Sequence, residues 1–410
     1  MARVSQHLDW FRVVLLAIPA VVFWSVWLPA QDTGFPELGT EIVRLVRDHF
    51  YNKDQAEAWA GKHAEYAREL TSRTQFIDQT KKILAELNAS HTGYYTSEDT
   101  AYYAIRAIFN ELSGPDYEDR RVESIGINIS PDGFVRTIFV GSPAAETDLQ
   151  RGDRIVLCDD QPFQPINSIK GKEGQRVRLT IQKTQDGPTS TLDLQVRLID
   201  PIEEWLYHLV DGTRIIKTTE GRRSLYVPYY CGAGERFTEA FENIIQEKQD
   251  SADLMILDAR SGWGGSPPNL IARFDRAVPA LEMRQRDKIT QLQSSWRKPI
   301  IVLVDGGTRS GKEVFAWAIQ KHHRGRLIGQ KTAGAVVGGT PYTLKDGSLL
   351  FLAVADIRVD GQRLEGIGVV PDITVPEDLA YSQGRDRTLE AAIQEADLIL
   401  QKQTPLGQEP

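Results

Sequence analysis

A single serine stands at a strand-to-helix corner in VDGGTRSGKEVFAWAIQ, residues 304–320. The apolar run PIIVLV leads into this corner and has the character of a buried strand, while VFAWAIQ behind it is typical of a helix. Two chemistries fit such a corner. Gly306, Gly311 and Lys312 match the spacing of a phosphate-binding loop, whereas Ser310 at the start of a helix would suit a nucleophile.

The phosphate-loop interpretation fails at the position after the lysine. That motif needs a serine or threonine whose hydroxyl binds magnesium, and the chain has Glu313 there. A carboxylate at this position would repel a triphosphate. Asp258, near the end of LMILDA, imitates the acidic strand of such enzymes but precedes the loop. We therefore keep a nucleotide-binding enzyme only as a minor alternative.

A serine hydroxyl is a weak nucleophile unless it has a base, an orienting group and an oxyanion hole. Several further stretches follow one order along the chain. They are SHT, a β-rich segment, DARSGWGG, VDGGTRSGKE, and GQKTAG followed by DGSLLFLAVADIRVDGQRLEGIGVVPDITV. This ordered set resembles the carboxyl-terminal processing (tail-specific) and tricorn-type serine peptidases. The resemblance covers nearly everything after the N-terminal segment.

In that family pattern Ser310 takes the nucleophile's place, and the resemblance implies acyl transfer to its hydroxyl. The amide of Gly311 is then one oxyanion donor, and the Gly264–Gly265 turn of DARSGWGG supplies the second, since glycine lets backbone approach a substrate closely. The alternative for Ser310 is a helix N-cap.

The base distinguishes two branches of the family. Tail-specific peptidases use a lysine inside a TFGKG motif, but Ala335 holds that place here, and neither Lys331 nor Lys312 matches it. The tricorn-type branch uses Ser, His, Ser and Glu. His91 and Ser90 in ASHTGYY and Glu365 in RLEGIGVVPD fall on those positions. The resemblance thus implies His91 as general base, with Ser90 or Glu365 orienting it.

Short alternating runs from about residue 119 predict strands, separated by the turn signals PDG and DGP. GSPAAETDLQRGDRIVLCDDQPF within them resembles a PDZ domain. That resemblance implies a peptide-binding strand edge at Ile125, Gly126 and Ile127, where backbone amides would take a chain-end carboxylate. The alternative is that Gly126 only permits a turn or bulge.

The element pattern indicates a multidomain α/β protein. Residues 31–115 are predicted to form a helical module with the SHT loop, 116–198 a PDZ domain, and 199–402 an α/β peptidase core, of ClpP/crotonase-like type by resemblance, with a tail at 403–410. Asp258 and Arg260 would brace the glycine turn, Trp263 would line a pocket, and His322–His323 would end a helix.

The first 30 residues are typical of an export signal. Arg3 and Arg12 flank the start, Val13 to Leu28 is almost wholly apolar, and LPAQD closes the segment. The apolar run is shorter than the roughly 20 residues of a usual membrane span. We expect a periplasmic or extracellular protein, with this segment either a cleaved signal or an inner-membrane anchor.

Composition and charge limit the classes of molecule that the protein can bind. The 410 residues carry a formal net charge of −8 with no basic run, which argues against nucleic acid. The only cysteines, Cys158 and Cys231, offer neither a disulfide framework nor metal-ligand spacing. The sequence predicts protein or peptide substrates, recognised through their C-terminal residues, and no metal or organic cofactor. The main rival is an inactive homologue that binds chain ends.

Overall fold

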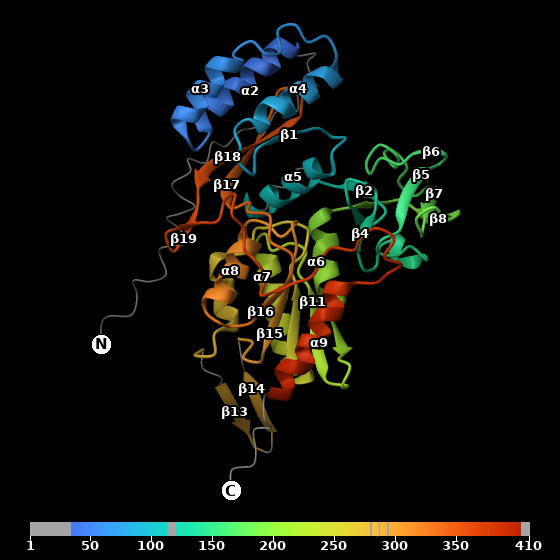
Figure 1. The fold of residues 1–410 in the computed structure, drawn as a ribbon, viewed down its shortest axis with the longest axis vertical. Helices are drawn as coiled ribbons and strands as arrows, with labels where there is room; N and C mark the ends of the chain where they lie inside the picture. The colour runs from blue at the N-terminus through green and yellow to red at the C-terminus, as the bar shows by residue number, and fades with distance from the viewer. Residues whose placement is uncertain (1–33, 114–119, 279–280, 287, 293–294, 403–410) are drawn as a thin grey trace.

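The computed structural model describes residues 34–113, 120–278, 281–286, 288–292 and 295–402 (Figure 1). The predicted export segment and the tail 403–410 lie outside the described residues. Among the helices that are described, none is both long and apolar enough to cross a bilayer.

A six-stranded sheet forms the centre of the molecule (Figure 1). All neighbouring strands pair in parallel except the first two in the spatial order, which are antiparallel. The spatial order is β10 (Arg214–Lys217), β11 (Arg223–Pro228), β12 (Leu254–Asp258), β15 (Ile300–Val304), β16 (Arg326–Gly329) and β21 (Ile373–Thr374).

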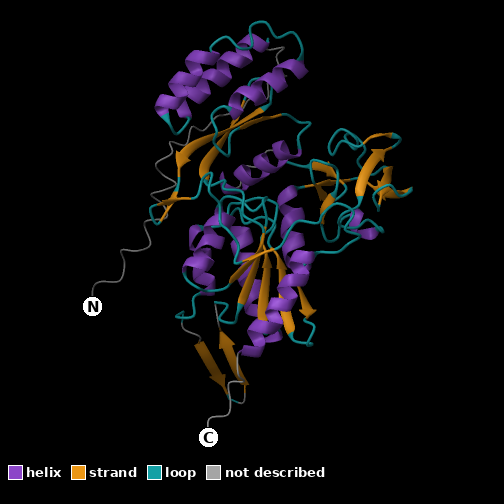
Figure 2. Cartoon of the chain, in the orientation of Figure 1, coloured by secondary structure: helices purple, strands orange, loops and turns teal. Residues whose placement is uncertain are grey.

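Both faces of the central strands β12 and β15 are buried, which explains why these strands are almost continuously apolar. Along β15, Ile300, Val302 and Val304 belong to one core cluster, and Ile301 and Leu303 to another. Helices cover both faces (Figure 2). The first cluster holds α6 (Pro201–Asp211), α7 (Glu235–Lys248) and α8 (Gly311–Lys321), and the second holds α9 (Arg387–Lys402).

The N-terminal helices share their core with a distant segment. α2 (Phe35–His49), α3 (Lys53–His63) and α4 (Arg73–Ala85) pack on a three-stranded sheet of β1 (Gly93–Tyr95), β18 (Leu349–Asp356) and β17 (Val337–Thr343). The apolar stripe of α2 requires such a partner, because a lone amphipathic helix cannot bury it. This layer is therefore not made of residues 31–115 alone.

Helix α5 (Thr100–Ser113), the last helix within the predicted helical module, lies between this layer and the central sheet (Figure 1). Its apolar residues Ile105, Ile108 and Phe109 recur at helical spacing. Ala104, Ala107 and Ile108 join the core cluster of the central sheet. Tyr102 and Ile105 instead pack with Leu349 and Phe351 of β18.

Residues 122–199 form a β-rich module beside α6. It contains three small antiparallel sheets around one apolar cluster that includes Ile125, Val135, Ile155 and Leu179. Its elements are β2 (Val122–Ser124), β3 (Ile127–Ile129), β4 (Val135–Ile138), η1 (Ala144–Glu146), β5 (Arg154–Cys158), β6 (Gln161–Pro162), β7 (Arg176–Gln182), β8 (Thr189–Gln195) and β9 (Arg197–Ile199).

The remaining elements lie outside the sheets that position the site. They are η2 (Gln249–Ser251), η3 (Pro268–Phe274), the hairpin of β13 (Leu281–Gln285) and β14 (Lys288–Leu292), and the hairpin of β19 (Arg358–Val359) and β20 (Gln362–Arg363).

Candidate active site

Ser310 lies at the end of the turn that joins β15 to α8. Its backbone has φ 56° and ψ −129°, a region that residues with a Cβ rarely adopt. Such strain persists only where surrounding contacts enforce it, and it often marks functional positions. Here the Ser310 amide donates to the Ala335 carbonyl (3.0 Å) and to Oε2 of Glu313 (3.3 Å).

The buried carboxylate of Glu313 connects this turn to the segment after β16. It accepts hydrogen bonds from the amides of Gly334 and Ala335, both 2.7 Å, and from the Thr332 hydroxyl at 2.5 Å. Burial raises the pKa of Glu313, and these donors oppose the rise. The residue that rules out a phosphate loop therefore holds the KTAG segment in place.

The glycine-rich loop that follows β12 packs directly on Ser310. A Cβ at Gly264 would lie 2.5 Å from the Ser310 Cβ, and one at Gly311 would lie 2.4 Å from the Ser266 carbonyl oxygen. Only glycine fits at either position. Gly265 also requires glycine, because its φ is +82° and Ala233 fills the neighbouring space. As the first residue of α8, Gly311 has an amide without an intrahelical partner, which suits an oxyanion donor.

Two charged groups, Asp305 and the buried Lys312, tie this loop to the Ser310 turn. Oδ1 of Asp305 accepts from the amides of Ser261 (2.7 Å) and Thr308 (2.9 Å). Lys312 is fully buried, and its Nζ donates to the carbonyls of Tyr230 and Ser261. Burial lowers the pKa of Lys312 to about 8. Lys312 thus has a structural role. Lys331, the other lysine considered from the sequence, is exposed.

His91 lies in the loop between α4 and β1, with the ring against Phe351 of β18. Its Nδ1 is 3.0 Å from the Ser90 hydroxyl oxygen, and that hydroxyl donates to Oε2 of Glu365 at 2.8 Å. Glu365 is itself buried. Its Oε1 accepts from the Ser90 amide and its Oε2 from the Val336 amide, both at 2.7 Å.

This network assigns the histidine tautomer. The Ser90 hydroxyl has one proton, which it gives to a carboxylate that can only accept. In its contact with His91 the Ser90 hydroxyl oxygen must therefore accept a hydrogen bond from Nδ1–H. The unprotonated nitrogen of the ring is therefore Nε2, the atom that can take a proton from a nucleophile.

The environment of His91 keeps the ring neutral. Its pKa is lowered from 6.5 to about 4, mainly by burial and also by the positive charge of Arg309, while the negative charge of Glu365 opposes both. Arg309 also lies over the Trp263 ring, with 5.7 Å between its guanidinium carbon and the ring centroid. Sequence reasoning missed Arg309, although its position directly before Ser310 is the signal that could have found it.

Ser90, His91 and Ser310 line one pocket of about 470 Å³ together with Gly264, Gly265 and Ala335. Glu365 lies behind it. The structure therefore assembles residues that are as much as 275 positions apart in the chain. The other walls are mostly apolar and include four residues of helix α5, namely Ile105, Ile108, Phe109 and Leu112.

The predicted braces Asp258 and Arg260 form an ion pair outside this pocket. Arg260 Nη2 lies 2.6 Å from Asp258 and 2.7 Å from Asp386, which begins the approach to α9. Despite its burial, Asp258 has a pKa lowered to about 2 by Arg260. His322 ends α8 as predicted, with its amide donating to the Ala318 carbonyl.

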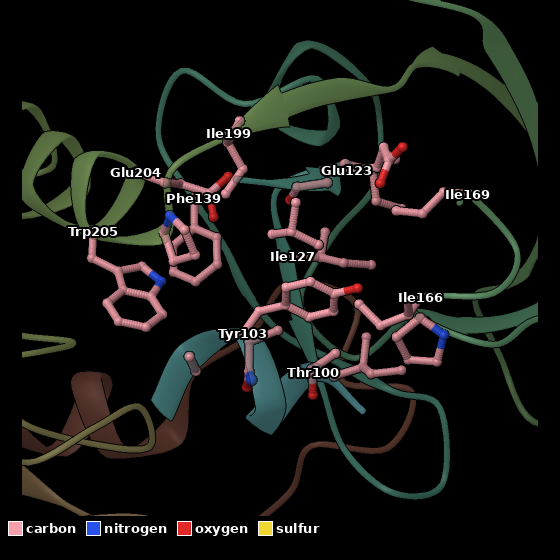
Figure 3. Close-up of a pocket in the computed structure, with 18 of the residues that line it drawn as sticks. Thr100, Tyr103, Glu123, Ile127, Phe139, Ile166, Ile169, Ile199, Glu204 and Trp205 are labelled. Carbon is pink, nitrogen blue, oxygen red and sulfur yellow. The ribbon is translucent and has the colours of Figure 1, made fainter. Parts of the chain in front are cut away.

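Ile125 and Ile127 line a different cavity of about 160 Å³, between the β-rich module, α5 and α6 (Figure 3). Gly126 lies between β2 and β3 with φ +81°, and a Cβ there would lie 1.9 Å from that of Ser142. Trp263 lines both cavities, so the Ser310 pocket and the cavity of the β-rich module share this wall residue.

Comparison with known proteins shows which family this geometry resembles. Residues 225–375 match the model described as Peptidase family S41. The matched part of the core is similar to S41 peptidases. The predicted resemblance to carboxyl-terminal processing and tricorn-type peptidases is thereby confirmed, and it supports a hydrolase that acts as a serine peptidase.

The chain is 25% identical over 464 aligned positions to a putative tricorn protease homolog 2 of Streptomyces coelicolor, covering 98% of this chain and 38% of that protein. It is also 25% identical over 380 positions to a carboxyl-terminal-processing protease of Synechocystis, covering 84% of each. The structure superimposes on the tricorn protease with a TM-score of 0.57 at 20% identity, over 90% of this chain and 37% of that one.

Proposed function

We propose that the chain is an exported serine endopeptidase that forms an acyl-enzyme at Ser310 with His91 as general base. The observation that carries this proposal is the hydrogen-bonded series from Glu365 through Ser90 to His91, on the wall of the pocket that also contains Ser310. The series leaves Nε2 as the basic nitrogen and supplies a carboxylate for the charge that the ring acquires.

In the first half of the reaction Nε2 of His91 removes the proton from the Ser310 hydroxyl as its oxygen attacks the peptide carbonyl. The carbonyl electron pair moves onto the oxygen, where the amides of Gly311 and Gly264 stabilise it. The carbon–nitrogen bond then breaks, and the imidazolium gives its proton to the departing amine. The products are an acylated Ser310 and a new amino terminus.

In the second half a water molecule takes the place of the amine. His91 accepts a proton from this water, whose oxygen attacks the ester carbonyl, and then returns a proton to Ser310. The Ser90 hydroxyl can accept from Nδ1–H throughout while donating to Glu365. Because both oxygens of Glu365 accept backbone amides, the carboxylate cannot rotate away from Ser90.

The pocket walls indicate which side chain lies next to the cleaved bond. Ile105, Phe109 and Phe351 present apolar surface beside Ser310, and Arg309 supplies the cationic group of the lining. An apolar side chain gains from leaving water in such a pocket, at about 25 cal/mol per Å² of surface buried. We infer a preference for large apolar residues on the acyl side of the cleaved bond.

We further propose that residues 116–198 are a PDZ-type module that presents substrate to this pocket. The strand edge at Ile127 lies along a cavity that shares Trp263 with the Ser310 pocket, so a bound chain would lie next to the nucleophile. The composition of residues 1–30 supports export, either with a cleaved signal or with an inner-membrane anchor.

Cleavage of an unfolded protein by the full chain and by Ser310→Ala tests the proposal. We expect cleavage only by the unsubstituted chain, with both proteins showing the same thermal unfolding. Equal cleavage by both would overturn Ser310 as nucleophile. Absence of cleavage by a folded chain that still binds peptides would favour the rival function, a catalytically inactive homologue that binds chain ends.

A further inference from the structure

The cavity of the β-rich module has an open strand edge. Three successive residues of β3, Ile127 to Ile129, line it. Neighbouring side chains of a strand point to opposite faces, so consecutive residues reach one cavity only along an edge. Within the described residues β3 pairs with β4 alone, which leaves its second edge for another strand.

The side chains around this edge are largely apolar. Phe163, Ile166 and Ile169 come from the segment after β6, and Phe139, Ile199 and Trp205 complete the walls. Figure 3 shows the labelled members of this set, Ile166, Ile169, Phe139, Ile199 and Trp205, around a common space, with Tyr103 of α5 on another side. An extended peptide with apolar side chains therefore fits the edge and the walls together.

The charged residues that line the cavity are both acidic. They are Glu123 of β2 and Glu204 in the first turn of α6, and none of the described lining residues is Lys, Arg or His. Glu123 already accepts a hydrogen bond from the Gly171 amide at 3.0 Å. Glu204 extends from α6 toward the strands of the module, as Figure 3 shows.

Glu204 reaches the loop where a chain-end carboxylate was expected to bind. Its carboxyl is hydrogen-bonded to Ser124, and burial raises its pKa to about 7 against the effect of that bond. The hydroxyl oxygen of Ser124 accepts in turn from the Gly126 amide at 2.9 Å. An amide that could hold a substrate carboxylate is thus already linked, through Ser124, to a carboxyl group of the protein.

We propose that Glu204 determines what this cavity accepts, selecting an apolar peptide segment that carries a lysine or arginine side chain and disfavouring a free chain-end carboxylate. The inference rests on the proposed function, because the bound segment would belong to the substrate. A cation in this cavity faces a lining with two carboxylates and no basic side chain, whereas a further carboxylate would be repelled. The anticipated binding of chain ends at Ile125–Ile127 is then replaced by binding of internal segments.

The test uses the full chain with Ser310→Ala, which binds without cleaving. Fluorescence anisotropy at about pH 8 would compare three apolar peptides of one length: an amidated peptide with a central lysine, the same peptide with glutamate, and one with an apolar end and a free carboxylate. We expect the lysine peptide to bind at least about tenfold more tightly than either other peptide.

Adding Glu204→Gln should reduce this preference to within about twofold, whereas Glu203→Gln should leave it unchanged. Glu203 is the matched control, since it directly precedes Glu204 on α6 and pairs with Arg236 on the exposed side. Tighter binding of the free-carboxylate peptide, no binding of any peptide, or a preference that survives Glu204→Gln would each overturn the inference.

The comparison among peptides needs only the Ser310→Ala chain, so the inference stays testable if Glu204→Gln does not fold. It also separates this inference from the proposed function. Ser310-dependent cleavage with no preference for the lysine peptide would reject the role of Glu204 alone. Selective binding without any cleavage by the unsubstituted chain would reject the peptidase and retain the selective groove.

Discussion

Ser310 and Glu365 hold two successive residues of one chain segment. The Ser310 amide donates to the carbonyl of Ala335 at 3.0 Å, and Oε2 of Glu365 accepts from the amide of Val336 at 2.7 Å. The nucleophile and the carboxylate behind the base are thus positioned by the same short stretch. Where a lysine would lie in the other branch of the family, Ala335 contributes backbone to this link.

The carboxylate of Glu365 is predicted to be essential for the rate of cleavage. Both oxygens of Glu365 accept hydrogen bonds, from Ser90 and from the Val336 amide. Glu365→Gln keeps the shape of the side chain, but its NH₂ group must then face one of these donors. We expect kcat to fall by about 10²- to 10⁴-fold with KM nearly unchanged. Steady-state kinetics would measure this, with exposed Asp360→Asn as the control. An unchanged kcat would contradict the assignment.

Arg309 should set the acid limit of activity. Its positive charge acts with burial to lower the pKa of His91 to about 4. Removal of the charge in Arg309→Gln raises that pKa, so the acid limb of kcat/KM should move to higher pH, while Arg309→Lys should move it less. The pH profiles of the three proteins provide the measurement. A limb that shifts to lower pH, or stays in place, would be incompatible with His91 as the base beside Arg309.

Leu112 of α5 is predicted to influence substrate preference without supporting the core. It lines the Ser310 pocket and is 48% exposed. Leu112→Asp should reduce kcat/KM for peptides with a large apolar residue before the cleaved bond. The ratio of kcat/KM for peptides with a basic residue there to kcat/KM for the apolar peptides should rise. Leu398 on α9 is equally exposed, so Leu398→Asp is a matched control. Identical preferences in all three proteins would show that α5 does not form the specificity wall.

His208 should make the fold sensitive to acid. Burial lowers its pKa from 6.5 to about 4, and its Nδ1 accepts from the Val140 amide of the β-rich module. The unfolded chain therefore binds this proton first, and stability is lost as pH falls from 6.5 toward 4. His208→Gln should lose less free energy of unfolding than the unsubstituted chain between about pH 7 and pH 5. Urea unfolding measures this, and an equal loss would argue against the shift.

The parts of the fold that the sequence made predictable are those with local signals. The apolar runs of β12 and β15 are buried on both faces, and Ser310 follows such a run directly. The order of SHT, DARSGWGG and VDGGTRSGKE was sufficient to nominate His91, Gly264 and Ser310. All three line one pocket, although their roles in the reaction stay predictions.

The parts that could not be predicted depend on contacts between distant segments. The apolar residues of helix α5 follow a helical pattern, but the sequence does not show what they pack against. Their contact with Phe351 of β18 is visible only in the fold. The partner of the N-terminal helices lies about 300 residues later, in β17 and β18. In the sequence Glu313 only breaks a phosphate-loop motif. Its structural role is hidden because three of its four hydrogen-bond donors come from residues 332–335, which are distant in the chain.

Covalent labelling of Ser310 by a fluorophosphonate tests the central claim most directly, because the probe reacts only with an activated hydroxyl. Mass spectrometry of the labelled chain should find the adduct on the peptide that contains Ser310 and none in Ser310→Ala. Labelling should slow by at least about 10²-fold in a folded His91→Gln chain. A folded protein that is not labelled at Ser310, or is labelled as fast without His91, would contradict the account.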